Sequence, residues 1–287
     1  MQNIKPMSNK YFSVLILITF SNFSYAQFTK DYVDIYSQTS IELLANKGDK
    51  GLWSGTGFLI DLNNKIYLIT NNHIVGEEYK KNEYKQLYNR DLPPDSIPDA
   101  LLLKCYSEKL NQWSVNKILI RPKNEPLFIK FYEDDNDKNT ILDVVAIPID
   151  TLPLNNNSAR LVWLSNIDLH PEILLYPSEE LFIVGYPSDA GKINPLPIWK
   201  RGTIASEPNL EKVNASWFWI DATTRGGMSG SPVFIRASSF VTKSGVTQYT
   251  QVVTSLIGIY SAQNYSLELG RVTKLDKVFA KLLSIKN

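Results

Sequence analysis

The distribution of apolar residues along this chain predicts many short β-strands. Apolar and β-branched residues come in short runs between Gly, Pro, Asn and Asp clusters, with little helical periodicity. Residues 55–61 and 65–70 flank Leu62-Asn63-Asn64 and predict a β-hairpin. Further strands are expected at residues 101–106, 113–120, 127–132, 143–149, 160–164, 181–187, 199–206, 217–222, 233–235, 251–253, 255–260 and 268–272. This pattern is typical of an all-β barrel or sandwich.

Two segments depart from the strand pattern. Residues 40–44 fit a short helix or a strand. Residues 274–284 have a helical period and predict a terminal helix. Its expected apolar face consists of Leu275, Val278, Phe279, Leu282 and Leu283.

Two polar segments indicate how the chain is divided. Residues 76–98 are rich in Lys, Glu, Tyr, Asn, Asp and Pro without a clean period, and we interpret them as a surface insertion. Residues 151–158 are rich in Pro and Asn between apolar strands and predict a linker. We therefore expect an N-terminal part at residues 27–155 and a C-terminal part at residues 156–287.

The first residues have the order of a secretory signal peptide. Lys5 and Lys10 precede an apolar run at residues 11–23, and the small residues Ser24 and Ala26 suit cleavage after Ala26. The run is shorter than the roughly 20 residues that a membrane-spanning helix needs. We expect residues 1–26 to be removed from an exported protein that is periplasmic or extracellular and is not held in a membrane.

Composition narrows the classes of partner. The chain has 30 basic and 29 acidic residues and a net charge of +1, and no basic stripe is interleaved with aromatic residues. This argues against a nucleic-acid partner. The single cysteine, Cys105, allows no internal disulfide and is expected to be a small buried residue of a strand. Neither Cys105 nor His73 has companions at metal-ligand spacing, so we expect no metal and no cofactor.

A glycine-rich loop places one serine between two apolar strands. Residues 223–234 contain Ser229, and Gly226, Gly227 and Gly230 beside it allow positive φ angles that turn backbone N–H groups toward one point. Two such N–H groups form an oxyanion hole, which stabilises the charged intermediate of acyl transfer. Taken alone, such a loop fits a plain turn equally well, so the interpretation depends on a base and an acid elsewhere.

His73 and Asp143 are the candidate base and acid. His73 ends an apolar strand, whereas His170 lies in a loop-like context and is expected to be exposed or to cap a turn. Asp143 opens the apolar run Asp-Val-Val-Ala-Ile-Pro-Ile, a context that Asp61, Asp150 and Asp221 lack. The order His73, Asp143, Ser229 is that of the chymotrypsin arrangement.

These segments resemble those of the chymotrypsin-fold (trypsin-like) serine peptidases, in the disulfide-free bacterial form of the HtrA and glutamyl-endopeptidase branches. The similar segments are residues 55–58, 68–75, 143–149 and 227–232. The resemblance implies two six-stranded antiparallel β-barrels, with His73 and Asp143 on the first and Ser229 on the second, followed by a short helix. It also implies that the backbone N–H groups of Gly227 and Ser229 form the oxyanion hole.

The resemblance further implies the residues that bind a polypeptide substrate. Thr223 would stand at the base of the specificity pocket, Ser261 on the strand that pairs with the substrate backbone, and Ala262 and Gln263 on the pocket wall. Met228 occupies the position of the aspartate that switches on many animal members, so that ion pair is absent. Thr223 replaces the aspartate of trypsin-type enzymes, so we expect small or neutral side chains before the cleaved bond.

The sequence therefore predicts a secreted serine endopeptidase with the triad His73, Asp143 and Ser229. A second reading is a catalytically silent, protease-like protein that binds a peptide or partner in a misaligned cleft. A third is an esterase on the same fold.

Overall fold

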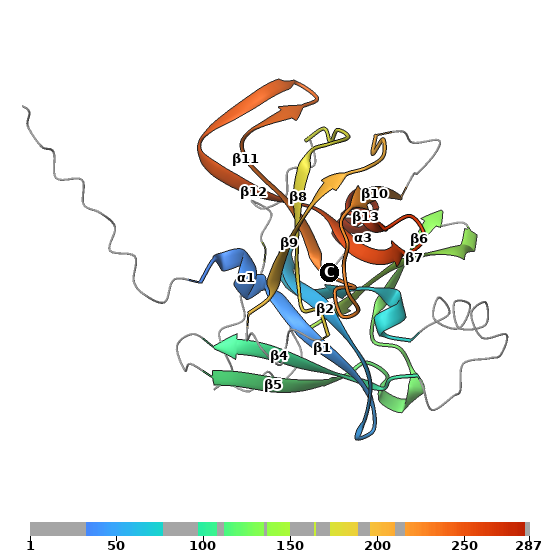
Figure 1. Cartoon of the computed structure of the whole chain (residues 1–287). Helices are drawn as coiled ribbons and strands as arrows, with labels where there is room; N and C mark the ends of the chain where they lie inside the picture. Colours follow the sequence, from blue (N-terminus) through green and yellow to red (C-terminus); the bar gives the residue numbers. More distant parts are fainter. Residues whose placement is uncertain are drawn as a thin grey trace, which may run out of the picture. The chain divides into compact units, whose positions relative to one another are not determined.

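β-Strands make up most of the structure, a computed structural model that describes residues 33–76, 97–107, 112–134, 137–149, 164, 173–188, 196–209 and 216–284. The strands form two antiparallel sheets within one unit, which begins at Asp34 (Figure 1). The expected signal peptide, the linker, the division near residue 155, His170 and residues 77–96 of the insertion lie outside the described residues. No helix in the described part is both long and apolar enough to cross a membrane.

The N-terminal sheet has seven strands in the order β5-β4-β1-β2-β3-β7-β6. They are β1 (Ser40–Lys47), β2 (Lys50–Leu62), β3 (Lys65–Thr70), β4 (Ala100–Ser107), β5 (Gln112–Leu119), β6 (Ile129–Asp134) and β7 (Asp137–Pro148). Helix α1 (Ile35–Thr39) precedes β1. Residues 40–44, which fitted a short helix or a strand, belong to strand β1. The hairpin of β2 and β3 is confirmed, and its turn residues Asn63 and Asn64 have φ angles of 54° and 60°, as a type I′ turn requires.

The C-terminal sheet is a closed barrel in the order β10-β13-β12-β11-β8-β9. Its strands are β8 (Glu180–Gly185), β9 (Ile198–Ile204), β10 (Trp217–Asp221), β11 (Pro232–Thr242), β12 (Gly245–Asn264) and β13 (Leu269–Lys274). The all-β fold with two sheets is confirmed, and this barrel has the six strands expected. The N-terminal sheet has a seventh strand because β4–β5 and β6–β7 are separate hairpins that pair with β1 and β3, respectively.

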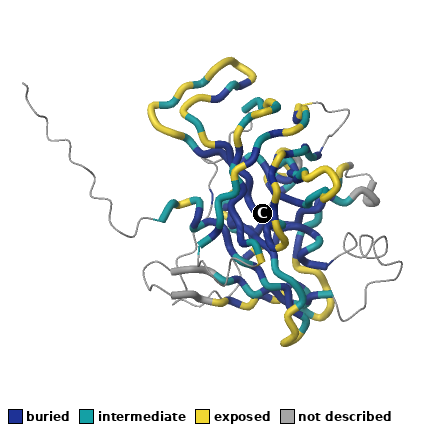
Figure 2. The backbone as a smooth tube through the Cα atoms, viewed as in Figure 1, coloured by how far each residue is buried: buried dark blue, intermediate teal, exposed yellow. Residues whose placement is uncertain are grey.

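Strands β11 and β12 are longer than the sequence pattern predicted. They form a hairpin that projects beyond the barrel (Figure 1), and Figure 2 shows that much of its outer part is exposed. Within it, residues 249–252 of β12 oppose only Ser238 of β11. Such a bulge bends a strand and interrupts its edge. This hairpin lies apart from the buried centre where the two sheets meet.

The core that joins the two sheets holds them together. One cluster contains Phe58 and Val144 from the N-terminal sheet together with Phe234 and Ile259 from the barrel, all fully buried. Full burial of side chains of this size contributes about 1.5–3 kcal/mol each. Each sheet also has its own cluster, and Figure 2 shows the buried residues concentrated at the centre.

The predicted terminal helix is present as α3 (Asp276–Ser284). Leu275, Val278 and Leu282 are buried in the shared cluster, and Phe279 packs against it. Leu283 is an exception to the predicted apolar face, because it is 49% exposed. The residues in contact with the core recur every three or four positions and form one stripe of the helix surface, and Leu283 lies outside this stripe.

Candidate active site

Strand register brings His73 and Asp143 together. Strands β3 and β7 pair through Thr70 and Val145, after which the chain turns into the 3₁₀ helix η1 (Asn72–Ile74). His73 Nδ1 lies 2.8 Å from Asp143 Oδ2, and the backbone N–H of His73 donates to Asp143 Oδ1 at 3.0 Å. One carboxylate therefore fixes both the ring and the backbone of His73.

Asp143 is held in a buried position. Its side chain is 2% exposed, against 14% for His73, and the Asn71 amide donates to the backbone carbonyl of Asp143 at 2.6 Å. Because His73 Nδ1 faces a carboxylate, the neutral ring carries its proton there and has its lone pair on Nε2. An imidazole in this tautomer can accept a proton at Nε2 while the carboxylate stabilises the resulting cation.

Two consecutive tight turns form the loop around Ser229. The Met228 N–H donates to the Arg225 carbonyl at 3.2 Å, and the Ser231 N–H donates to the Met228 carbonyl at 3.1 Å. Gly227 and Gly230 each occupy the third position of a turn, with φ angles of 89° and 87°. A positive φ at this position favours glycine. Ser229 follows the first residue of the second turn and is partly exposed.

The backbone N–H groups of Gly227 and Ser229 are oriented by the hydrogen bonds of the carbonyl groups that precede them. The Gly226 carbonyl accepts the Ser188 N–H at 2.8 Å, and the Met228 carbonyl accepts the Ser231 hydroxyl at 2.6 Å. In a trans peptide the N–H points opposite to the C=O, so the N–H groups of Gly227 and Ser229 point away from these partners. Neither N–H donates to another described residue. Gly226, unlike the other two glycines, does not have a positive φ.

Thr56 connects this loop to the strands that carry His73. Its N–H donates to the Ser229 carbonyl at 2.8 Å, and its Oγ1 donates to the Gly227 carbonyl at 2.8 Å. The Thr70 hydroxyl donates to the Thr56 carbonyl at 2.7 Å, and Thr70 is only three residues before His73. The structure thus brings the Ser229 loop of the barrel against β2 and β3. Sequence analysis did not identify Thr56 or Thr70.

Strand β12 is hydrogen-bonded to the Ser229 loop as far as Tyr260, and Ser261 follows this contact. The Gly230 N–H donates to the Tyr260 carbonyl and the Tyr260 N–H donates to the Ser231 carbonyl, both at 2.9 Å. Ser261 is fully buried, and its hydroxyl lies 2.7 Å from Thr273 Oγ1. Within the described chain, residues 262–264 pair with β13 and with no strand on their other side. This edge is open to an added strand.

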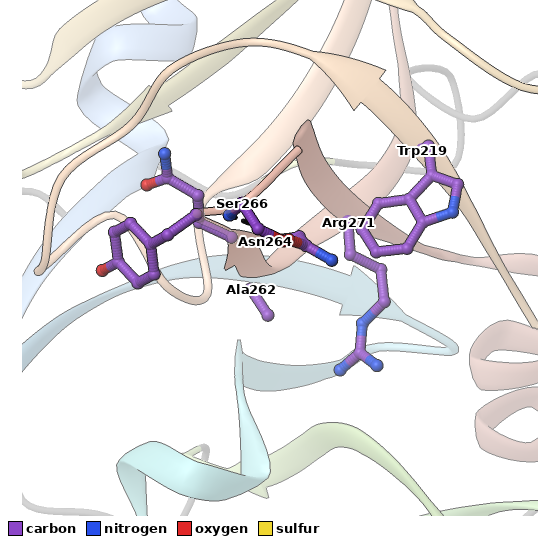
Figure 3. A pocket seen from close by; sticks show the side chains of 7 residues that line it. Trp219, Ala262, Asn264, Ser266 and Arg271 are labelled. Carbon is purple, nitrogen blue, oxygen red and sulfur yellow. Dashed lines mark hydrogen bonds between the residues drawn. The ribbon is translucent and has the colours of Figure 1, made fainter. Parts of the chain in front are cut away.

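The two threonines before the loop differ in position. Thr223 is exposed, whereas Thr224 is buried and its hydroxyl contacts the Tyr260 hydroxyl and, at 3.4 Å, Gln263 Oε1. Burial raises the pKa of Tyr260 to about 12. The buried polar group that faces Gln263 is therefore Thr224. Gln263 and Ala262 both line a pocket of about 420 Å³ (Figure 3).

The fold and this site define a peptidase of the chymotrypsin fold. The family model of the trypsin-like peptidase domain matches residues 55–241, which is more than half of the chain. The chain belongs to the trypsin-like peptidase family and is a serine-type endopeptidase.

Several solved structures are similar to this chain. The serine endoprotease from Yersinia pestis has 14% identity and a TM-score of 0.48, covering 88% of this chain and 68% of that one. A protease from M. tuberculosis in its active form has 14% identity and a TM-score of 0.44, with 87% and 82% covered. Catalytically active tobacco etch virus protease, in complex with product, has 16% identity and a TM-score of 0.45, with 88% and 81% covered. No curated protein sequence matches this chain.

Proposed function

We propose that this protein is a secreted serine endopeptidase that cleaves peptide bonds through an acyl-enzyme formed on Ser229. His73 acts as the base and Asp143 orients it. The proposal is carried by one observation, the buried Asp143 carboxylate bound to both Nδ1 and the backbone N–H of His73. Thr56 and Thr70, which link the strand before His73 to the Ser229 loop, support the assignment of Ser229.

The proposed reaction follows from these positions. Ser229 Oγ attacks the substrate carbonyl while His73 Nε2 takes its proton, and the negative charge develops on the former carbonyl oxygen. The N–H groups of Gly227 and Ser229 bind this oxygen. The C–N bond then breaks as His73 passes the proton to the leaving amine, and a water molecule, deprotonated by His73, hydrolyses the ester.

We expect a small or neutral side chain directly before the cleaved bond. The groups near the Ser229 loop that support this are neutral, namely the hydroxyls of Thr224 and Tyr260 and the amide of Gln263. A lysine or arginine side chain would be desolvated there without a carboxylate, at considerable cost. A cleavage profile on a peptide library tests this, and a strong preference for Lys or Arg would contradict it.

Export remains part of the proposal and rests on residues 1–26 alone. Expression of the full chain in a bacterial host with a secretion pathway should give a product that starts at Gln27, as determined by N-terminal sequencing of the exported fraction. A full-length protein retained in the cytoplasm would contradict export without affecting the proposed reaction.

A fluorophosphonate probe tests the reaction, because it labels only an activated serine. We expect labelling of the wild type, none of Ser229→Ala, and very slow labelling of His73→Ala. Ser284→Ala, which changes a remote exposed serine, should react like the wild type. A folded wild type that does not react would favour the silent peptide-binding protein, and faster turnover of esters than of matched peptides in the absence of proteolysis would favour the esterase.

A further inference from the structure

The pocket beside Ala262 lies on the outer face of the barrel. Trp219 on β10 pairs with Arg271 on β13, and Arg271 pairs with Ala262 on β12, so the three side chains share one face of three adjacent strands. Their strand neighbours Phe218 and Val272 are fully buried inside the barrel. In Figure 3, Arg271 lies between the Trp219 ring and the Ala262 and Asn264 side chains.

The groups around this pocket are mainly hydrogen-bond donors. Arg271 contributes a guanidinium group, which also lies 5.9 Å from the Trp217 ring. Asn264 Oδ1 accepts from the Ser266 N–H at 3.1 Å and from the Ser266 hydroxyl at 2.7 Å. Because these bonds occupy the oxygen of Asn264, its amide has the two N–H donors left for a ligand. The Trp219 indole adds an apolar wall.

The charge of the pocket favours an anionic ligand. Among the residues that the structure describes, no aspartate or glutamate lines the pocket. The nearest acidic residues along the same elements are Asp221, two residues after Trp219, and Glu268 in the turn before β13, and both are exposed to solvent. A planar guanidinium group beside further donors matches the two oxygens of a carboxylate. The ligand chemistry that this pocket fits is therefore a carboxylate on a short apolar stem.

The open edge of β12 determines which substrate residue reaches the pocket. A substrate strand that pairs antiparallel with residues 261–264 runs toward Ser229, because Tyr260 is bonded to Gly230 beside it. The residue opposite Ser261 then precedes the cleaved bond, and the residue opposite Ala262 is the second before it. Side chains alternate between faces, so the second and fourth residues share the face of Ala262 and Arg271.

We propose that this pocket is a specificity subsite for an aspartate or glutamate side chain at the second or fourth residue before the cleaved bond. Arg271 is the residue that recognises its carboxylate. The inference rests on the proposed function, since it requires a substrate strand along β12. It goes further because it adds selectivity for a charged substrate residue. The substrate residue directly before the cleaved bond is expected to be neutral.

Matched peptide substrates test the subsite in the active enzyme. Peptides with a neutral residue before the cut would carry Glu or Gln at each of the four preceding positions. We expect Glu to exceed Gln in kcat/KM by about tenfold at the second or fourth position only, as a charge-assisted hydrogen bond provides. Arg271→Met keeps an apolar stem over Trp217 and should abolish this ratio, whereas Arg271→Lys should retain part of it. Arg201→Gln removes an exposed arginine on β9, which forms an ion pair with Glu180, and should leave the ratio unchanged.

Two outcomes would overturn the subsite while leaving the peptidase intact. One is equal turnover of Glu and Gln peptides at the second and fourth positions, and the other is a Glu preference that survives Arg271→Met. If Arg271→Met does not fold, as judged by circular dichroism, the wild-type ratio in 1 M NaCl replaces it. Screening should then bring the ratio close to one, and an unchanged ratio would contradict the charge pairing.

A binding measurement separates failure of the subsite from failure of the proposed function. In Ser229→Ala, a fluorescent Glu peptide should bind about tenfold more tightly than its Gln counterpart, and Arg271→Met should remove the difference. Absence of Ser229-dependent turnover in the wild type, together with this selective binding, would refute the proposed function but support the subsite. Equal binding of both peptides would refute the subsite.

Discussion

The N-terminal sheet and the C-terminal barrel contribute different kinds of group to the site. The sheet supplies side chains, because the register of β3 and β7 places His73 beside Asp143. Besides the Ser229 hydroxyl, the barrel supplies backbone, because two glycine turns orient the Ser229 loop and its N–H groups. Changes to the side-chain half should therefore reduce activity without loss of the fold. Changes to the backbone half should reduce both activity and stability.

Asp143→Asn should have the largest effect on activity. The amide cannot hold the His73 tautomer whose lone pair is on Nε2, and loss of this role costs about 10⁴-fold in kcat in comparable triads. The protein should stay folded, because the amide has nearly the same shape. Rates on a peptide substrate and urea unfolding measure the two effects. Asp61→Asn, on β2 of the same sheet, should change neither, and a loss of less than tenfold in Asp143→Asn would contradict the side-chain role.

Gly230→Ala should damage both activity and stability. Gly230 has a φ of 87°, and a Cβ would lie 2.0 Å from the Thr56 carbonyl oxygen, so the loop must move. We expect kcat to fall on the order of 10²-fold through misplacement of Ser229. The free energy of unfolding should fall by about 3 kcal/mol.

Gly48→Ala is the matched control for this change. Gly48 has a φ of 57°, and a Cβ would have no atom within 4 Å. This variant therefore isolates the cost of the left-handed conformation, about 1 to 2 kcal/mol, and should leave kcat unchanged. If Gly230→Ala were no worse than Gly48→Ala, close packing of the loop on Thr56 would not matter for the site.

Thr56→Val tests the connection between the two halves. The change keeps the shape but removes a hydroxyl that donates to the Gly227 carbonyl and accepts the Tyr186 N–H at 2.9 Å. Two buried backbone groups lose a partner, so we expect a loss of about 2 kcal/mol in unfolding free energy. Because the Gly227 N–H is a proposed oxyanion donor, kcat should fall about tenfold. Thr242→Val removes a buried hydroxyl that bonds to the Gly245 carbonyl in the remote hairpin turn and should not change kcat.

Local patterns explain what could be predicted from the sequence. The Asn63-Asn64 turn was predictable because asparagine tolerates the positive φ angles of a type I′ turn. The positive φ angles of Gly227 and Gly230 were predictable because the loop is too short to reverse direction otherwise. His73 and Asp143 were found through their flanking apolar runs, and the register of those runs then brings them together.

Features that depend on contacts between distant segments could not be predicted. Thr56 is recognisable only from its bonds to Gly227 and Tyr186, far away in the sequence. Counting six residues back from Ser229 selects Thr223, which is exposed, whereas its neighbour Thr224 is buried and contacts Tyr260. The projecting β11–β12 hairpin was predicted too short, because residues 246–252 carry only Val246, Tyr249 and Val252 among polar residues, and none of the seven is buried, so there is no buried face to detect.

Tyr260→Phe should have the smallest effect on activity. It changes a barrel side chain whose own backbone bonds to the Ser229 loop. Burial raises the pKa of Tyr260 from 10 to about 12. A raised tyrosine pKa means that the stabilisation is fully present below pH 10 and is lost as pH rises through 12. Wild type should therefore lose about 1 kcal/mol between pH 7 and pH 11, beyond any loss in the variant.

At neutral pH, Tyr260→Phe loses only the hydrogen bond to Thr224, worth about 1 kcal/mol. The Tyr260 backbone keeps its bonds to Gly230 and Ser231. We therefore expect kcat to change by less than about threefold, whereas misplacement of a reacting group would lower it on the order of 10²-fold. Urea unfolding at pH 7 and pH 11 measures the stability, with Tyr176→Phe, 43% exposed, as the control. An equal alkaline loss in Tyr260→Phe and wild type would show that another group titrates. A large fall in kcat would show that the barrel positions Ser229 through side chains as well, and the contrast between the two halves would fail.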